Sequence, residues 1–384
     1  MRPVAESMRG RERCVLAGLR RGETGSFEED IQEMAQLCDT AGAMVVHTMV
    51  QRRERIDPAT YWGAGKLAEI AAVMQRDNCT TLVADAELSP AQVRNIEESV
   101  RAKVVDRSQL ILDIFARHAA TSEARIQVEL AQMRTLYPRL THAWSHFSQQ
   151  VGGIGTRGPG ETQLEVDRRL IQKKISELHR RLHRVEQSRR LQRRSRKRQF
   201  NATLVGYTNV GKSSLLNRLC GSRVLVRNQL FATLDTASRR TWLPGAGSVV
   251  LSDTVGFLRR LPHHLVASFR STLEVVCDSD LIVVVLDASS PWCLQQGETV
   301  DEVLDGLGAA DRERMVVYNK SDSLTSSLER KRLGLRHPGA LFVSAVSGEG
   351  VEEVRQALAQ HALDCRRERE QRDREPVVVE VPLP

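Results

Sequence analysis

The sequence predicts an α/β protein with two regions of alternating strands and helices, separated by a long helical hairpin. Short apolar runs alternate with amphipathic stretches from residue 13 to about 120 and again after residue 199. This alternation is typical of parallel sheets with helices on their faces. At 384 residues the chain is also too long for one ordinary core. We therefore expect an N-terminal α/β domain (1–121), a hairpin (122–198), a second α/β domain with a parallel-dominated sheet (199–365) and a C-terminal tail (366–384).

The N-terminal region alternates four strand-like runs with four helical stretches. The runs are CVLAGL, MVVHTMV, TTLVAD and KVVD, and the helices are expected near 27–41, near 66–75, from Ser89 and from Ser108. No obvious catalytic set of side chains follows from this region. Its glycine-rich segment YWGAGK, residues 61–66, could approach a phosphate. We favour the alternative, a strand-to-helix turn, and leave a nucleotide contact open.

Two long helices are expected between the α/β regions. The first, EARIQVELAQMRTLY, should stop near Pro138, and the second should run from Glu161 towards Arg196. Apolar residues of the second helix recur at coiled-coil spacing, which predicts a seam that packs on the first helix as an antiparallel hairpin. The seam residues are Leu164, Ile171, Ile175, Leu178, Leu182 and Val185.

The positive charge of the chain is concentrated in the second hairpin helix. Between Arg168 and Arg198 there are 14 Lys or Arg and only two Glu, against a net charge of +8 for the whole chain. Such a run is often just a solvated face. Here the charge is of one sign and continues past the seam into SRRLQRRSRKR, which favours nucleic-acid phosphates. Because aromatic residues are few, structured RNA recognised by shape is the expected ligand.

The loop between the two helices, GGIGTRGPGETQ (152–163), has the glycine spacing of a dinucleotide-binding turn. That motif should follow a strand and precede a helix within a βαβ unit. No β-branched run precedes this loop and no strand follows it before Phe200. We therefore expect a flexible hairpin tip that can enter a narrow RNA-lined space, and the alternative is a simple connection.

Several classes of protein are disfavoured by composition. The longest apolar run, Leu281 to Leu286, is far too short to cross a bilayer, and the N-terminus lacks the apolar region of a secretory signal. The seven cysteines are scattered and form no C-x-x-C pair, which suggests neither a disulfide framework nor a zinc site. We expect a cytoplasmic monomer without a membrane span, and leave a peripheral membrane association open.

A phosphate-binding loop stands at the start of the second α/β region. Gly206-Tyr-Thr-Asn-Val-Gly211-Lys212-Ser213 fits G-x-x-x-x-G-K-[ST], preceded by the strand-like FNATLV and followed by the helical SLLNRL. In this motif the backbone amides and the helix dipole face the phosphates, and the Lys212 position reaches the β and γ oxygens. Ser213 is expected to reach Mg²⁺.

A second motif selects the base. Asn319-Lys320-Ser321-Asp322 closes the apolar run Met315 to Tyr318. A carboxylate at Asp322 can accept hydrogen bonds from the ring N1–H and the 2-amino group of guanine, a donor pair that adenine lacks. The pocket would be completed by the backbone of Ser344 and Ala345 at the guanine O6. The sequence therefore predicts GTP as substrate rather than ATP.

Two further segments lie between these motifs. In VVLSDTVGF an apolar strand delivers Asp253, which would support Mg²⁺ through a water, and Gly256, whose amide would meet the γ-phosphate. In LFATLD, Thr233 is placed to add a hydroxyl ligand to Mg²⁺ when GTP is bound. Lys212, Thr233 and Gly256 are thus the expected γ-phosphate and transition-state contacts, and no catalytic base can be assigned.

These motifs, in this order, resemble the HflX family of ribosome-associated GTPases. The N-terminal segments ATYWGAGKL, ELSPAQVRNIE, DRSQLILDIFA and GGIGTRGPGETQLEVDRR also resemble that family, so the likeness runs from about Arg13 to about Gln356. It implies Mg²⁺ on Ser213 and Thr233. It also implies a nucleotide site made of Gly206, Tyr207, Thr208, Asn209, Val210, Gly211, Lys212, Ser213, Phe231, Ala232, Thr233, Leu234, Asp235, Asp253, Thr254, Val255, Gly256, Asn319, Lys320, Ser321, Asp322, Ser344, Ala345 and Val346.

Three positions qualify the resemblance. Phe257 stands where many signalling GTPases have a water-orienting glutamine, so intrinsic hydrolysis should be slow. Asn209 stands where K⁺-activated GTPases place an asparagine ligand, which leaves K⁺ dependence open. The sequence TASRR after LFATLD replaces a proline-containing turn often seen in the family, and this puts the detail of loop closure in doubt.

The resemblance implies a GTPase that binds the large ribosomal subunit and its rRNA. It would promote ribosome dissociation or rescue during stress and release after hydrolysis, with the ribosome completing the catalytic site. An RNA-binding assembly or remodelling GTPase is the alternative, and a switch for a protein partner is a third interpretation.

Overall fold

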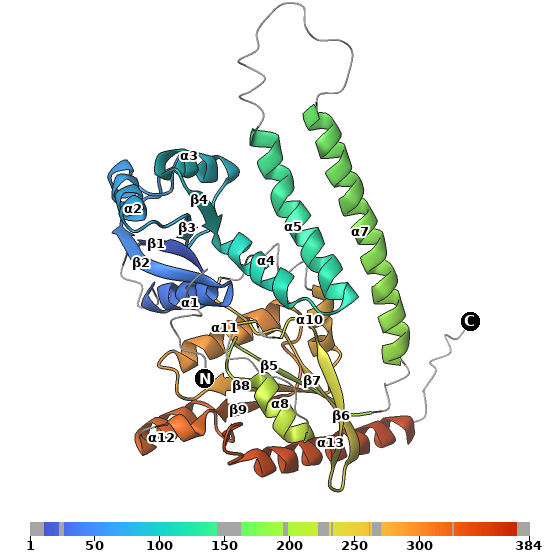
Figure 1. Ribbon diagram of the computed structural model, residues 1–384. Coiled ribbons are helices and arrows are strands. Elements are labelled where there is room, and N and C mark those ends of the chain that lie inside the picture. Colours follow the sequence, from blue (N-terminus) through green and yellow to red (C-terminus); the bar gives the residue numbers. More distant parts are fainter. Residues whose placement is uncertain are drawn as a thin grey trace, which may run out of the picture. The chain divides into compact units, whose positions relative to one another are not determined.

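The computed structural model describes residues 11–22, 27–143, 163–194, 199–221, 230–231, 233–260, 262, 270–324 and 326–374. The chain divides into two units, residues 1–186 with 262–268 and residues 187–261 with 269–384. Each unit contains one parallel-dominated sheet (Figure 1). In the described residues no helix combines the length and the apolar character needed to span a membrane.

The first unit contains a four-stranded sheet of order β2-β1-β3-β4, in which every neighbouring pair is parallel. The predicted alternation of strands and helices is confirmed. Its elements are β1 (Glu12–Arg20), α1 (Phe27–Thr40), β2 (Ala43–Arg52), α2 (Ala64–Arg76), β3 (Thr81–Ala84), α3 (Pro90–Val100), β4 (Lys103–Asp106) and α4 (Arg107–His118).

Local sequence accounts for where these helices begin. Ser89 and Gln92 form a capping box at the start of α3, and Pro90 occupies its first turn. The segment 61–66 is the turn that enters α2, as favoured from the sequence: the Gly63 amide donates to Gln51 Oε1 at 3.0 Å, and Trp62 is buried in the core under α2 and α3.

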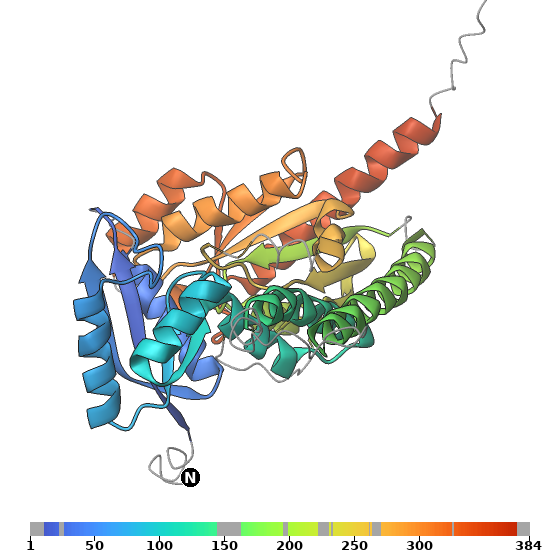
Figure 2. The ribbon, with the colours of Figure 1, turned by 90° about the horizontal axis from the view of Figure 1, so that it is seen from above.

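The helical hairpin consists of α5 (Ser122–Ala143) and α7 (Gln163–Arg194), which run side by side in both views (Figures 1 and 2). The expectation that the first helix stops near Pro138 is wrong, because α5 continues through this proline to Ala143. A proline removes one intrahelical donor but leaves the following residues able to keep helical dihedral angles. The glycine loop, residues 152–162, lies outside the described residues.

Contacts between the two helices follow the predicted seam. Leu178 is buried, and Ile171, Ile175, Leu182 and Val185 are half-buried. Polar pairs flank the seam between the helices, since Lys174 Nζ lies 3.1 Å from a carboxylate oxygen of Glu129 and Gln172 donates to the Tyr137 hydroxyl at 2.6 Å. The seam of α7 therefore packs on α5, as expected.

The second unit contains a six-stranded sheet of order β10-β9-β8-β5-β7-β6, in which only the β6–β7 pair is antiparallel. The predicted parallel-dominated sheet is confirmed. The strands are β5 (Asn201–Gly206), β6 (Ala237–Leu243), β7 (Gly247–Asp253), β8 (Leu281–Asp287), β9 (Arg314–Asn319) and β10 (Leu341–Phe342). The helices are α8 (Lys212–Cys220), α10 (Arg270–Cys277), α11 (Cys293–Gly306), η1 (Ser321–Ser323), α12 (Ser327–Arg336) and α13 (Val351–Arg374).

Helices cover both faces of this sheet. Side chains of α10, α11 and α12 share one core cluster with alternate residues of β8, namely Ile282, Val284 and Leu286. On the other face, α8 contacts β5, β6 and β7, and α13 contacts α8 and β6. Figure 2 shows α13 continuing past the strands. Residues 366–374 of the expected C-terminal tail belong to α13, and residues 375–384 lie outside the described residues.

Candidate nucleotide site

The candidate site lies where strands of the six-stranded sheet end. The phosphate-binding loop follows β5, Asp253 ends β7 and Asn319 ends β9. Because these strands are parallel, their carboxyl ends meet at one edge of the sheet, where α/β proteins bind ligands. The fold thus brings together motifs that are more than 100 residues apart in sequence.

Two glycines of the phosphate-binding loop are required by close contacts. Gly206 and Gly211 have positive φ angles of 154° and 90°. A Cβ atom on Gly206 would lie 2.2 Å from the Val285 carbonyl oxygen, and one on Gly211 would lie 2.3 Å from Asn319 Nδ2. Both distances are far below a normal contact, so the loop can approach its neighbours only without side chains at these positions.

Lys212, the first residue of α8, is buried. Its Nζ donates to the carbonyl oxygens of Gly206 at 3.1 Å and Tyr207 at 2.8 Å. Burial lowers the pKa of Lys212 to about 8, and the nearby Asp253 carboxylate opposes this shift. The arrangement provides a desolvated cation held by backbone dipoles, which an anionic phosphate would stabilise.

Three side-chain oxygens gather beside this lysine. The Ser213 hydroxyl lies 2.8 Å from Thr233 Oγ1 and donates to Asp253 Oδ2 at 2.5 Å. Burial raises the pKa of Asp253, and Lys212 lowers it. Two hydroxyls and a carboxylate form a hard-oxygen donor set of the kind that suits Mg²⁺. The positions expected from the sequence to hold Mg²⁺ are therefore brought together.

Besides Ser321 Oγ after β9, two buried oxygens at this edge have no hydrogen-bond partner among the described residues. They are Thr208 Oγ1 in the phosphate-binding loop and Asp253 Oδ1 at the end of β7. A buried polar atom without a partner costs free energy. Both atoms are thus suited to a ligand, and the residues present fit a magnesium-bound nucleotide.

The loop that carries Thr233 is anchored by its apolar residues. Phe231 and Leu234 are buried, so these side chains secure the loop rather than offer polar contacts, while Thr233 reaches Ser213. Asp235 precedes the edge strand β6, which begins at Ala237 within the TASRR segment. Ala232, the remaining expected residue of this loop, lies outside the described residues.

The segment after β7 is tied directly to the phosphate-binding loop. The Phe257 amide donates to Gly206 O at 3.1 Å, and the Thr208 amide donates to Phe257 O at 2.8 Å. A Cβ atom on Gly256 would lie 2.7 Å from Thr208 Cα, so glycine is required for this contact as well as for any approach to phosphate. The Phe257 ring is buried in the core, away from solvent.

Asn319 joins the base-binding segment to the phosphate-binding loop. Its Nδ2 donates to Val210 O at 2.7 Å, and its Oδ1 accepts from the Ala345 amide at 3.0 Å. Asp322 is exposed at the surface. A hydrogen bond from the Ser344 hydroxyl holds the pKa of the Asp322 carboxyl below its ordinary value. An ionised acceptor for the N1–H and 2-amino group of guanine is thus available.

The backbone of residues 344–346 differs in detail from the expectation for the guanine O6. The Ala345 amide already donates to Asn319, and the Ser344 amide donates to Glu349 O at 2.9 Å. Three further residues of the expected set, Val210, Thr254 and Val255, are buried and support the loop backbones, and the Thr254 hydroxyl donates to Leu204 O at 2.8 Å. Asn209 is exposed.

Two contacts in this region were not anticipated from the sequence. Lys320, in a left-handed conformation, places Nζ 2.6 Å from Asp287 Oδ2 at the end of β8. Arg218, in α8, donates from Nε to Ala345 O at 2.9 Å and from Nη2 to Val346 O. Asp287 closes the apolar run 281–286, a position that could have suggested a strand-end role, whereas no local signal marks Arg218.

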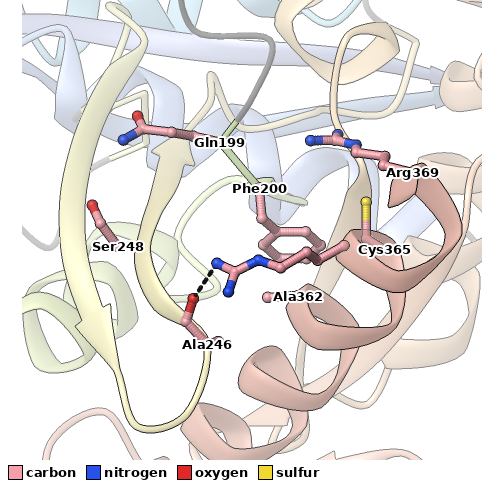
Figure 3. A pocket seen from close by; sticks show the side chains of 8 residues that line it. Gln199, Phe200, Ala246, Ser248, Ala362, Cys365 and Arg369 are labelled. Carbon is pink, nitrogen blue, oxygen red and sulfur yellow. Dashed lines mark hydrogen bonds between the residues drawn. The ribbon is translucent and has the colours of Figure 1, made fainter. Parts of the chain in front are cut away.

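A pocket of about 260 Å³ in the same unit lies away from this site (Figure 3). Phe200 precedes β5 and Ser248 lies near the start of β7, so the pocket is at the amino ends of strands whose carboxyl ends carry the nucleotide motifs. The dashed bond in Figure 3 joins Arg366 to the Ala246 carbonyl at 2.9 Å. We therefore do not assign the nucleotide to this pocket.

Family models match three consecutive segments that together span residues 28–320 with short gaps. Residues 28–116 match the GTP-binding GTPase N-terminal family, and residues 118–196 match the GTP-binding GTPase middle region. Residues 201–320 match the family described as 50S ribosome-binding GTPase.

Individual relatives give the same result. The chain is 44% identical to the GTPase HflX of Lacrimispora saccharolytica over 345 residues, which are 89% of this chain and 81% of the relative. It is 43% identical to the GTPase HflX of Escherichia coli K12 over 335 residues, 86% of this chain and 79% of the relative.

One solved structure supports the fold, and a second has a lower score. A crystal structure of SsGBP in complex with GDP matches with a TM-score of 0.50 and 23% identity, covering 92% of this chain and 99% of the other. A GTP-binding protein from Sulfolobus solfataricus in complex with GDP matches with a TM-score of 0.48 and 22% identity over similar shares of both chains, 92% and 99%.

Proposed function

Since the chain belongs to the HflX family of GTPases and is a GTP hydrolase, we propose that it binds the large ribosomal subunit in its GTP state and promotes ribosome dissociation or rescue under stress. The G domain, residues 199–365, would hold the nucleotide, and the hairpin, residues 122–198, would contact ribosomal RNA. Hydrolysis would then release the protein.

The residues at the strand ends have distinct roles in this proposal. Lys212 and the amides of the phosphate-binding loop hold the β- and γ-phosphates, and the Gly256 amide meets the γ-phosphate. Ser213 and Thr233 would ligate Mg²⁺, with Asp253 supporting it through a water; bound there, the ion would neutralise charge on the phosphate oxygens. Asp322 selects guanine, and a hydrogen bond from the Ser344 hydroxyl holds its pKa below the ordinary value.

Slow intrinsic hydrolysis is part of the proposal. The Phe257 side chain is buried in the core and carries no polar atom, so it cannot orient a water molecule. Purified protein should therefore turn over GTP slowly, and ribosomes should accelerate it. Asn209 has an exposed side chain in a left-handed turn, and its position leaves open whether hydrolysis depends on K⁺. Replacing KCl by NaCl in the turnover assay would decide this.

The exposed face of α7 is the observation that carries the RNA contact. The seam of α7 is used for packing on α5, whereas Lys173, Arg180 and Arg184 are exposed. Among the residues that the structure describes, these three side chains form no ion pair, and their positions at i, i+7 and i+11 place them on one face of the helix. Unpaired cations of one sign are suited to the phosphates of folded RNA.

Sedimentation would test the proposal. Ribosomes would be centrifuged with the protein and a non-hydrolysable GTP analogue, GDP or no nucleotide. We expect co-sedimentation with the large subunit, and loss of intact ribosomes, only with the GTP analogue. Equal binding in all three conditions would show that the nucleotide does not control ribosome association, and would reject the proposed switch.

A charge-reversed hairpin tests which surface binds. Changing Lys173, Arg180 and Arg184 to Glu should abolish co-sedimentation while leaving GTP affinity within about twofold, because the nucleotide site lies in the other unit. A matched variant reverses three exposed cations of the G domain, Arg312, Lys331 and Arg332, with the same change in net charge. If both variants lose binding equally, general charge rather than the α7 face is responsible.

An assembly or remodelling role is the second candidate, because the same basic face would also bind precursor RNA. The two roles differ in substrate. A dissociation factor separates intact ribosomes in the presence of the GTP analogue, whereas an assembly factor binds immature subunits and leaves intact ribosomes unchanged.

A further inference from the structure

We propose that Arg218 positions the loop of residues 344–346 for recognition of the guanine O6, and so helps to set the preference for guanine nucleotides. This inference rests on the guanine site proposed above. Arg218 lies in the last turn of α8, the helix that begins with the phosphate-binding Lys212, and no residue of the nucleotide motifs is adjacent to it in sequence.

One guanidinium holds two successive carbonyl groups of this loop. Nε of Arg218 donates to Ala345 O at 2.9 Å, and Nη2 donates to Val346 O. Because the guanidinium is planar and rigid, two bonds from it fix the orientation of its acceptors as well as their position. Its place at the carboxyl end of a helix also suits a cation.

The bond to Ala345 O determines where the next amide points. In a trans peptide the C=O and N–H groups point in opposite directions, and the described chain contains no cis peptide. Fixing the Ala345 carbonyl on Arg218 therefore directs the Val346 amide away from α8. Among the described residues this amide makes no hydrogen bond, whereas the amides of Ser344 and Ala345 are already used. The Val346 amide is the donor that remains for O6.

Packing does not orient the tip of this loop. The Val346 side chain is 76% exposed, so apolar contacts do not hold it. The loop closes on itself through bonds from the Gly348 amide to Ser344 O at 2.8 Å and from the Ser347 amide to Ser344 Oγ at 3.0 Å. These bonds shape the turn, but they do not fix the peptide between Ala345 and Val346. Arg218 supplies that constraint.

The arrangement also links the two halves of the nucleotide site. One short helix carries Lys212 and Ser213 at its start and Arg218 near its end. Since a helix is rigid over this length, it sets the distance between the phosphate contacts and the loop that faces the base. Arg218 is thus a positioning residue and does not itself touch the nucleotide.

Nucleotide analogues separate this role from a general effect on stability. Dissociation constants would be measured on the isolated full-length protein with Mg²⁺ for GDP, for IDP, which lacks the 2-amino group, and for 2-aminopurine riboside diphosphate, which lacks O6 and the hydrogen on N1. Arg218→Ala should weaken GDP and IDP by roughly tenfold, the size expected for one hydrogen bond. Binding of the analogue without O6 should change less than about twofold, so the GDP preference over it falls by roughly tenfold.

Arg355→Ala is the matched control. Arg355 also holds the end of α8, donating to Leu219 O at 2.6 Å and to Trp242 O at 3.1 Å, but neither bond reaches residues 344–346. This variant should keep the wild-type ratio between GDP and the analogue without O6. A ratio lost equally in both variants would show that any damage to this helix end has the same effect, and would overturn the role of Arg218.

The remaining outcomes are also decisive. If Arg218→Ala weakens all three nucleotides equally, or none, the residue does not position an O6 donor. If Arg218→Ala fails to fold in a thermal unfolding test, Arg218→Lys, which keeps the charge but loses the fork, is measured for the same fall in ratio. A wild-type protein that binds GDP no better than the analogue without O6 would instead reject the O6 contact in the guanine site.

Discussion

The two sheets of this protein both place buried charges at the carboxyl ends of their parallel strands but use them differently. In the N-terminal domain, Arg107 follows β4 and donates to Asp85 Oδ1 at 3.0 Å and to Glu33 of α1, and all three side chains are buried. In the G domain, Lys212 is held by backbone carbonyls, and Asp253 Oδ1 has no partner among the described residues. The first set of charges is compensated by protein side chains, and the second remains suited to a charged ligand.

The two domains differ in what compensates a buried ionisable group at the end of a strand. Burial raises the pKa of Glu33 to about 7 in the first domain and lowers the pKa of Lys212 to about 8 in the second. In both cases desolvation disfavours the charged form. Arg107 opposes the shift for Glu33 and Asp253 opposes it for Lys212, and for Lys212 we expect the phosphates of the nucleotide to add to this opposition.

The largest expected effect is on stability, from Arg107→Ala. Removing the guanidinium leaves two buried carboxyl groups without their cation, which should lower the free energy of unfolding by about 3–5 kcal/mol. Urea unfolding would measure it. Because the Glu33 pKa is raised above its unfolded value, its favourable contribution is present at low pH and lost as pH rises through about 7. The deficit should therefore be smaller at pH 5 than at pH 8, and the opposite trend would contradict this account.

The second effect is on binding, from Lys212→Ala. Loss of a buried cation that faces phosphates should weaken GTP by about 3 kcal/mol, or roughly a hundredfold, while the free energy of unfolding changes little. Fluorescent-nucleotide titration would measure it. Lys66→Ala is the control, since Lys66 stands in the glycine-rich turn of the N-terminal domain and pairs with Glu69 at 2.5 Å. If that variant weakened GTP similarly, the N-terminal turn would have to be treated as a nucleotide contact.

A third, smaller effect depends on pH. The Lys212 pKa in the free protein is lowered to about 8, below its ordinary value of 10.5. Nucleotide binding requires the charged form, so affinity should fall as pH rises above 8 and be roughly tenfold weaker at pH 9 than at pH 7. Lys212→Arg, which stays protonated, should bind with a flat profile over this range. A flat profile in the wild type would mean that Lys212 keeps an ordinary pKa.

The smallest effect compares two buried threonines of the G domain. Thr208 Oγ1 has no partner among the described residues, whereas the Thr203 hydroxyl pairs with that of Ser279. Thr208→Val should stabilise the free protein by about 1 kcal/mol and weaken GTP, while Thr203→Val should destabilise it by about 1–2 kcal/mol and leave GTP affinity unchanged. Thermal unfolding with and without GTP would measure both. Destabilisation by Thr208→Val would show that its hydroxyl is satisfied within the protein.

Much of the architecture could be predicted because its signals are local. Apolar runs located the four strands of the first sheet and strands such as β5 and β7 of the second, but not the edge strand β6, whose sequence ASRRTWL is largely polar. The seam spacing of α7 predicted its contact with α5. The expected stop near Pro138 was wrong because a helix tolerates the loss of one donor when the following residues remain helical. The turn at Gly63 and the phosphate-binding loop were recognisable because glycine spacing reflects local backbone geometry.

The sequence by itself determined the order of elements, the phosphate-binding glycines and the residues expected to select guanine, because each depends on chemistry encoded within a few positions. Only the tertiary structure decided which groups meet across long separations. It paired Arg107 with Glu33, used the Ala345 amide for Asn319, buried Phe257 in the core and placed Arg218 against residues 345 and 346. The physical reason is that hydrogen bonds and desolvation depend on distances between elements, which no local pattern of side chains specifies.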